Sequence, residues 1–152
     1  MSQRSATHAT FVIERTYDAT PERVFTAWAD KSAKEQWFGP RDGGDHELDF
    51  RVGGREHFAA SLNGALYSYD ALYEDIVADE RIVYTYNMHR DGARMSVSVS
   101  TVELIAAGDR TRLRYTEQGV FLDGIDTPQA REHGTAEMLD KLGEALAAGA
   151  VV

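Results

Sequence analysis

Two carboxylates stand among aromatic residues at alternating positions, where the side chains of a strand share one face. Glu117 follows Tyr115 by two residues, and Glu56 precedes Phe58 by two. Burial among aromatic rings raises the pKa of a carboxyl group, which can then exchange protons near neutral pH as a general acid or base. If the protein is an enzyme of the cyclase or dehydratase kind, Glu117 is the first catalytic candidate and Glu56 the second.

A catalytic role for either carboxylate has a geometric condition. The side chain must point into a cavity, and no arginine can stand beside it, because a neighbouring positive charge lowers the carboxyl pKa again. An exposed strand edge, or an ion pair with Arg15, Arg55 or Arg114, is the simpler interpretation of both residues. We favour that interpretation and assign no catalytic residue from the sequence.

Aromatic and apolar residues at the expected open end of the fold predict a small-molecule site. Trp37 and Phe38 directly precede Gly39-Pro40, where a helix should end because the residue before a proline disfavours helical geometry. Tyrosine hydroxyls and indole N–H groups provide polar contacts inside an apolar wall. The residues predicted to bind the ligand are Phe25, Trp28, Trp37, Phe38, Phe58, Tyr84, Tyr86, Met88, Val97, Tyr115, Glu117, Gly134, Thr135, Met138 and Leu142. Plain core packing is the alternative for the aromatic and methionine positions, because protein interiors are close-packed.

Other kinds of site lack their sequence signals. The five histidines show no metal-type spacing, and we expect neither a metal ion nor a cofactor. The chain has no cysteine, which excludes disulfides, thiolate metal sites and a cysteine nucleophile. Gly43-Gly44 and Gly53-Gly54 are typical of turns rather than of phosphate loops, and no Gly-x-Ser-x-Gly signature occurs.

The composition argues against several classes of partner. Among 152 residues, 16 are Lys or Arg and 25 are Asp or Glu, which gives a formal charge of −9. A polyanion repels nucleic acid and anionic membranes. No apolar run is long enough for a membrane span, and the first residues lack the apolar segment of a secretory signal. We expect a cytoplasmic protein with a single domain over residues 1–152, its ordered core at about 8–148.

The elements that position these residues are predicted in the order strand, two short helices, five or six strands, long helix. Alternation over residues 8–19 predicts the first strand. Thr20 and Thr127 are N-cap candidates, each followed by a proline suited to the first helical position. The second short helix is expected over residues 31–37. Short turns between the later strands, such as Arg90-Asp91-Gly92, predict antiparallel neighbours.

Two-residue periodicity assigns side chains to the inner face of the sheet. The predicted inner sets are Glu56, Phe58 and Ala60; Ile82, Tyr84, Tyr86 and Met88; Met95, Val97 and Val99; and Leu113, Tyr115 and Glu117. The C-terminal helix presents an apolar face of Gly134, Met138, Leu142, Ala145 and Leu146, and Arg131 is assigned to its polar side. The pattern predicts an α+β fold. A curved antiparallel sheet of six to seven strands wraps around the C-terminal helix, and the two short helices plug one end of the groove.

This order resembles the START-like (SRPBCC) superfamily, the helix-grip fold, and more narrowly the homologues of the activator of heat-shock protein 90 ATPase. The motifs are "ERTYDATPERVFTAWAD", "QWFGP", "DFRVGG", "DERIVYTY" and "HGTAEMLDKLGEAL", which together span nearly the whole chain. The resemblance implies an internal cavity between sheet and helix, suited to an apolar or amphipathic molecule. Two residues depart from the family pattern: Thr135 replaces a usual tryptophan, and Glu56 replaces a usual apolar residue.

Three functions remain open at this point. The leading hypothesis is binding of a small hydrophobic or amphipathic molecule in the internal cavity. The second is the cyclase-like or dehydratase-like enzyme, and the third, implied by the family name, is a co-chaperone-like partner of heat-shock protein 90. The sequence leaves open which ligand binds, whether the cavity is filled by side chains, and whether the protein forms a homodimer.

Overall fold

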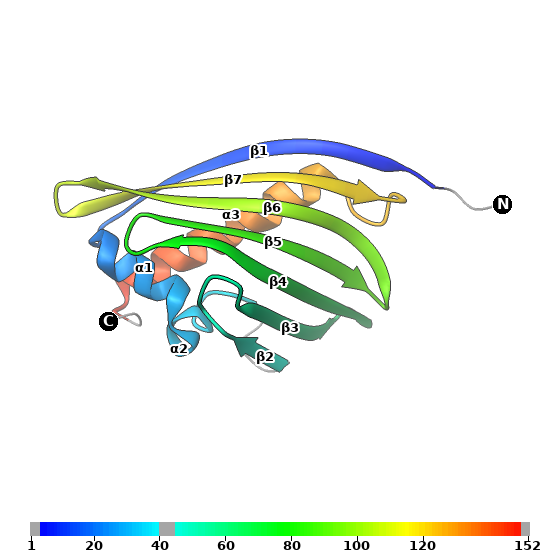
Figure 1. Cartoon of the computed structure of the whole chain (residues 1–152), viewed down its shortest axis with the longest axis horizontal. Coiled ribbons are helices and arrows are strands. Elements are labelled where there is room, and N and C mark those ends of the chain that lie inside the picture. The colour runs from blue at the N-terminus through cyan, green and yellow to red at the C-terminus, as the bar shows by residue number, and fades with distance from the viewer. Residues whose placement is uncertain (1–3, 40–44, 150–152) are drawn as a thin grey trace.

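The computed structural model describes residues 4–39 and 45–149. In this part of the chain, seven antiparallel strands form one sheet in the order β1-β7-β6-β5-β4-β3-β2, and α3 runs along its inner face (Figure 1). The elements are β1 (Ala6–Tyr17), α1 (Pro21–Ala29), α2 (Lys31–Lys34), β2 (Asp45–Leu48), β3 (Arg55–Leu62), β4 (Ala65–Val77), β5 (Arg81–Arg90), β6 (Ala93–Ala107), β7 (Arg110–Leu122) and α3 (Pro128–Ala147). The helix-grip fold predicted from the sequence is confirmed.

The helices begin at the capping residues that the sequence predicts. The Thr20 hydroxyl accepts a hydrogen bond from the Arg23 N–H at 3.3 Å, and the Thr127 hydroxyl accepts one from the Ala130 N–H at 3.1 Å. Each cap pairs an N–H group that the first helical turn leaves free. The predicted helix over residues 31–37 is shorter in the structure, because α2 ends at Lys34 and turns carry the chain onward. Pro40 and Gly43-Gly44 lie outside the described residues.

The sheet joins the first strand of the chain to the last. β1 pairs with β7 along its whole length, with Phe11 opposite Glu117. Every other pair of neighbouring strands is consecutive in the sequence. The turn between β5 and β6 has positive φ angles at Asp91 (49°) and Gly92 (84°), as the predicted hairpin chemistry requires.

α3 packs its apolar side against the concave face of the sheet and against α1. Leu139 and Leu142 are completely buried, and the Tyr17 hydroxyl of β1 donates to the Leu139 carbonyl at 2.7 Å. Trp28 of α1 is also buried in this core. No helix among the described residues has the length and apolar character needed to cross a membrane.

The predicted inner face of β6 is correct at Met95 and wrong at Val97 and Val99. Opposite Met88 and His89 of β5, the strand pairing shifts by one residue, so that Met95 and Ser96 are both buried. Such a bulge inverts the alternation that follows it. Ser98 and Ser100 therefore point inward, and Val97, a predicted ligand-binding residue, lies on the outer face. The serines tolerate burial because their hydroxyls reach polar partners on other elements.

Candidate functional site

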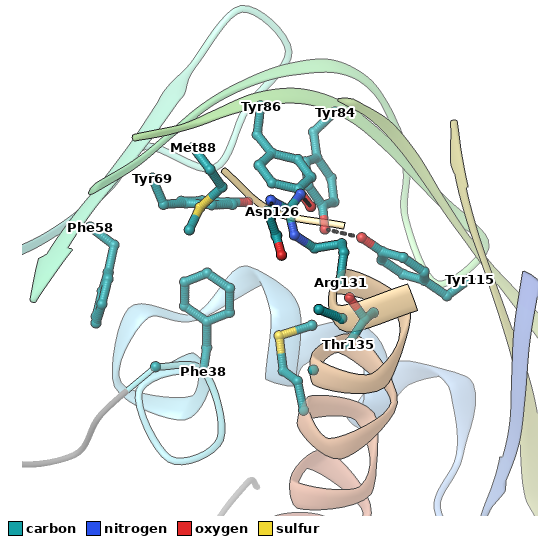
Figure 2. A pocket seen from close by; sticks show the side chains of 14 residues that line it. Phe38, Phe58, Tyr69, Tyr84, Tyr86, Met88, Tyr115, Asp126, Arg131 and Thr135 are labelled. Atoms are coloured by element: carbon teal, nitrogen blue, oxygen red, sulfur yellow. Dashed lines mark hydrogen bonds and ion pairs between the residues drawn. The ribbon is translucent and has the colours of Figure 1, made fainter. Parts of the chain in front are cut away.

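A pocket of about 280 Å³ opens between the concave face of the sheet and α3 (Figure 2). Nine predicted ligand-binding residues line it: Phe38, Phe58, Tyr84, Tyr86, Met88, Tyr115, Gly134, Thr135 and Met138. They come from the turn after α2, from the three strands β3, β5 and β7, and from α3, which the fold brings together around one space. Rings and thioethers dominate the wall, as in sites that bind apolar molecules.

The remaining predicted residues lie elsewhere. Trp28, Trp37 and Leu142 are buried in the core, and the half-buried Phe25 packs against Phe50 with ring centroids 5.6 Å apart. These four side chains pack in or against the hydrophobic core, which was the alternative to ligand binding. Glu117 is completely buried behind the pocket wall and does not line it.

Five residues line the pocket that sequence reasoning did not assign to it: Gly39, Tyr69, Asp126, Ala130 and Arg131. The prediction that Arg131 lies on the polar side of the helix is wrong, because only 9% of its side chain is exposed. Tyr69 could have been found from the sequence, since Tyr69, Ala71 and Tyr73 alternate along β4 and all three are buried.

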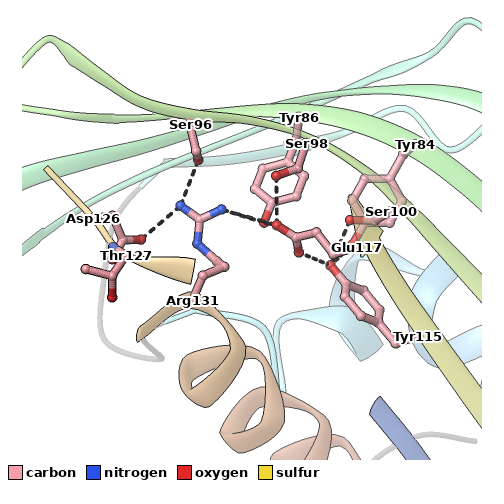
Figure 3. Close-up of polar contacts among 10 residues, drawn as sticks. All are labelled: Tyr84, Tyr86, Ser96, Ser98, Ser100, Tyr115, Glu117, Asp126, Thr127 and Arg131. Atoms are coloured by element: carbon pink, nitrogen blue, oxygen red, sulfur yellow. Dashed lines mark hydrogen bonds and ion pairs between the residues drawn. The ribbon is translucent and has the colours of Figure 1, made fainter. Parts of the chain in front are cut away.

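Glu117 is the centre of a buried polar network at the inner end of the pocket (Figure 3). The Tyr86 hydroxyl and the Ser98 hydroxyl each donate to Glu117 Oε2 at 2.7 Å, and the Tyr115 hydroxyl donates to Oε1 at 2.8 Å. Arg131 Nη1 lies 3.4 Å from Oε2. Each of these partners donates, so both oxygens of Glu117 act as hydrogen-bond acceptors. Burial raises the pKa of Tyr86 and Tyr115 well above the usual value, so both hydroxyls stay protonated.

Both terminal nitrogens of the Arg131 guanidinium donate hydrogen bonds to protein groups. Nη1 donates to the Tyr86 hydroxyl at 2.9 Å, and Nη2 donates to Ser96 Oγ at 2.8 Å and to Asp126 Oδ2 at 3.1 Å. Burial alone would lower the pKa of Arg131, but Tyr86 and the carboxylates of Glu117 and Asp126 raise it overall. The arginine therefore links α3 to three strands and to the loop before the helix.

A second buried ion pair lies beside the pocket, between α2 and β3. Lys34 Nζ is 2.6 Å from Glu56 Oε1, and both side chains are completely buried. The Tyr73 hydroxyl donates to the same oxygen at 2.7 Å, and His46 Nε2 lies 2.8 Å from Glu56 Oε2. Burial alone would raise the pKa of Glu56, but the Lys34 ammonium and the hydrogen bonds lower it to about 2. The Lys34 ammonium also lies 4.5 Å from the ring centroid of Phe38, a pocket residue.

Both carboxylates fail the geometric condition for acid or base catalysis. Each is buried outside the pocket lining and is neutralised by a cation, Glu117 by Arg131 and Glu56 by Lys34. The arginines expected from the sequence pair elsewhere, Arg15 with Asp140 and Arg114 with Glu14. The arrangement gives no support to the enzyme hypothesis. Among the described residues, no group of three or more His, Asp or Glu side chains could hold a metal ion.

His46 ties β2 to two carboxylates, and this predicts a pH dependence of stability. Nδ1 lies 2.8 Å from Glu35 Oε2 and Nε2 lies 2.8 Å from Glu56 Oε2, so both contacts are hydrogen bonds only when the imidazole carries two protons. The hydrogen bond to Glu56 is the largest cause that raises the pKa of His46 above the usual 6.5; burial and Lys34 oppose it.

A raised pKa in the folded state stabilises the fold below the unfolded pKa, and this contribution is lost as pH rises through the folded pKa. We expect the wild-type advantage over His46→Gln in free energy of unfolding to be complete below about pH 6.5 and to shrink above it. Urea unfolding of both proteins across neutral pH measures this difference. An advantage that grows with pH would contradict the assignment.

Comparisons with known proteins agree with the fold. The profile of a family described as "Activator of Hsp90 ATPase homolog 1-like protein" matches residues 18–147. The crystal structure of Mll3558 from Rhizobium loti is 48% identical, with a TM-score of 0.88 over 92% of this chain and 98% of that one. A protein structure from Rhizobium leguminosarum is 45% identical, with a TM-score of 0.87 over 92% and 95% of the two chains.

More distant structures share the fold alone. Protein SA2116 from Staphylococcus aureus is 22% identical, with a TM-score of 0.77 over 95% of this chain and 97% of that one. A search of curated proteins found no match.

Proposed function

Because this chain belongs to the Activator of Hsp90 ATPase homolog 1-like family, within a fold that commonly binds hydrophobic ligands, we propose that it binds a small apolar or amphipathic molecule in the pocket between sheet and α3. The observation that carries this proposal is the wall of six aromatic rings and two methionines around one space. At about 25 cal/mol per Å², a ligand that buries roughly 200 Å² of apolar surface gains about 5 kcal/mol before the costs of ordering.

The size of the pocket limits the ligand. Its 280 Å³ suits a molecule of about ten to fifteen non-hydrogen atoms, at roughly 20–30 Å³ each. A two-ring aromatic hydrocarbon is within this range, whereas a long-chain lipid would extend out of the opening. Methylnaphthalene is therefore a suitable first probe, and native mass spectrometry of the purified protein would detect a molecule that co-purifies with it.

Gly134 allows the pocket to be filled without disturbing its neighbours. It borders the pocket on α3, and a Cβ added there meets no heavy atom within 4 Å. We expect Gly134→Leu to weaken methylnaphthalene binding at least tenfold, while the better helix propensity keeps or raises stability by up to about 1 kcal/mol. Saturation-transfer NMR and thermal unfolding measure the two effects.

Gly134→Ala is the matched control. It gives at least the same gain in helix propensity and occupies little of the pocket, so it should bind methylnaphthalene as the wild type does. If the wild type binds no such probe, or if Gly134→Leu binds as well as Gly134→Ala, the proposed function is wrong.

A further inference from the structure

One buried side-chain oxygen in the pocket wall has no hydrogen-bond partner among the residues that the structure describes. Tyr69, on β4, is a pocket residue whose buried hydroxyl makes no hydrogen bond to any residue that the structure describes. Its ring is held between Tyr86 and Phe38, with centroids 5.0 Å and 5.2 Å away. Figure 2 shows the hydroxyl end directed to the middle of the pocket. Buried hydroxyls are normally paired, and an unpaired one costs free energy that a suitable partner recovers.

The hydroxyl is a donor under all ordinary conditions. Burial raises the pKa of Tyr69 well above the usual value, so the proton stays on the oxygen. A partner that uses this proton must therefore offer an oxygen or nitrogen that accepts a hydrogen bond. Thr135 lines the same pocket from α3, and no hydrogen bond of its hydroxyl is found within residues 4–39 and 45–149. Sheet and helix each present one available hydroxyl to the same space.

The charges around the pocket disfavour an anionic ligand. Among the lining residues that the structure describes, the cation is Arg131, and four hydrogen bonds to protein groups occupy its two terminal nitrogens. It is paired with two carboxylates, Glu117 and Asp126, so this cluster has an excess of one negative charge. A carboxylate ligand would enter against that charge, and the terminal nitrogens of the arginine already have protein partners.

We propose that the pocket selects an uncharged, ring-bearing molecule with a hydroxyl or carbonyl oxygen that accepts a hydrogen bond from Tyr69. The inference rests on the proposed function and specifies the ligand class for the same pocket. The aromatic walls take the rings, and the Tyr69 hydroxyl, with Thr135 on the opposite side, distinguishes an oxygenated molecule from the hydrocarbon of the same shape.

The test compares three naphthalenes that carry a methyl, a hydroxyl or a carboxylate at the same ring position. We expect the wild type to bind the naphthol about tenfold more tightly than methylnaphthalene and more than tenfold more tightly than the naphthoate. Tyr69→Phe removes one oxygen and keeps the ring. This variant should lose the preference for the naphthol and bind methylnaphthalene within about twofold of the wild type. Tyr67→Phe makes the same change on β4 outside the pocket lining and should keep the wild-type preferences.

The outcomes separate this inference from the proposed function. If the naphthol and methylnaphthalene bind equally, if Tyr69→Phe keeps the wild-type preference, or if the naphthoate binds most tightly, the ligand class is wrong while the pocket remains a binding site. A wild type that binds none of the three overturns the proposed function and the inference together. A wild-type preference for the naphthol that disappears only in Tyr69→Phe supports both.

Discussion

Replacement of Lys34 by methionine is expected to lower the free energy of unfolding by about 3–5 kcal/mol. The ammonium is completely buried, 2.6 Å from the equally buried Glu56 carboxylate. Methionine fills much of the same volume but removes the ammonium, so that the buried Glu56 carboxylate keeps the hydrogen bonds from His46 and Tyr73 and loses its lysine cation. The cost of that uncompensated charge greatly exceeds the modest value of an exposed ion pair. Urea unfolding followed by circular dichroism measures the change.

Two further variants identify the cause. Lys34→Met combined with Glu56→Leu removes both charges and should recover a large part of the loss. Lys31→Met is the matched control one helical turn earlier, since Lys31 is exposed and 3.8 Å from the exposed Glu35. It should change stability by no more than about 0.5 kcal/mol. If the double variant is as unstable as Lys34→Met plus the separate effect of Glu56→Leu, the charge pair is not the origin of the effect.

Trp37→Ala should destabilise the protein by about 3–5 kcal/mol and leave the binding of methylnaphthalene by the folded protein nearly unchanged. Trp37 is 1% exposed, and its ring lies 4.7 Å from that of Trp28 at an interplanar angle of 65°. Its indole N–H donates to the Ala27 carbonyl at 3.1 Å. The side chain thus anchors the segment after α2 to α1, and removing it leaves a cavity in the core.

Phe38→Ala is the informative comparison, because the adjacent ring is half-buried and lines the pocket. It should cost less stability than Trp37→Ala and weaken methylnaphthalene binding several-fold. Unfolding curves and NMR titrations of both variants separate the two roles. Should Trp37→Ala lose binding while it keeps its stability, the sequence-based assignment of Trp37 to the pocket would be correct after all.

The order of elements and most of the pocket wall could be predicted because local signals determine them. Thr20 and Thr127 are followed by prolines at the helix starts, and alternation along β5 and β7 assigns Tyr84, Tyr86 and Tyr115 to the inner face. In these strands, hydrophobicity and burial coincide, so periodicity is a sufficient guide.

The errors occur where polar groups are buried. Nothing in "MSVSVS" marks the bulge at Met95, and valine is the more hydrophobic choice for an inner face. The pattern along α3 places Arg131 with the exposed charges of that helix and carries no sign of its pairing with Glu117 on β7. A buried ion pair depends on two elements at once, and the pattern along either one does not contain it.

The pairing of β1 with β7 also affects how the chain folds. Phe11 is synthesised about a hundred residues before Glu117, the residue that it pairs with on β7. At roughly 5–20 residues per second, the ribosome takes about 5–20 s to reach that partner. During that interval the apolar side of the N-terminal segment has no native surface to cover it. Pairing β1 with β7 closes a large loop, and loop closure of this kind is slow in proteins with many non-local contacts. The last stage of folding is therefore expected to be the docking of the N-terminal segment, after the hairpins from β3 to β7 have formed.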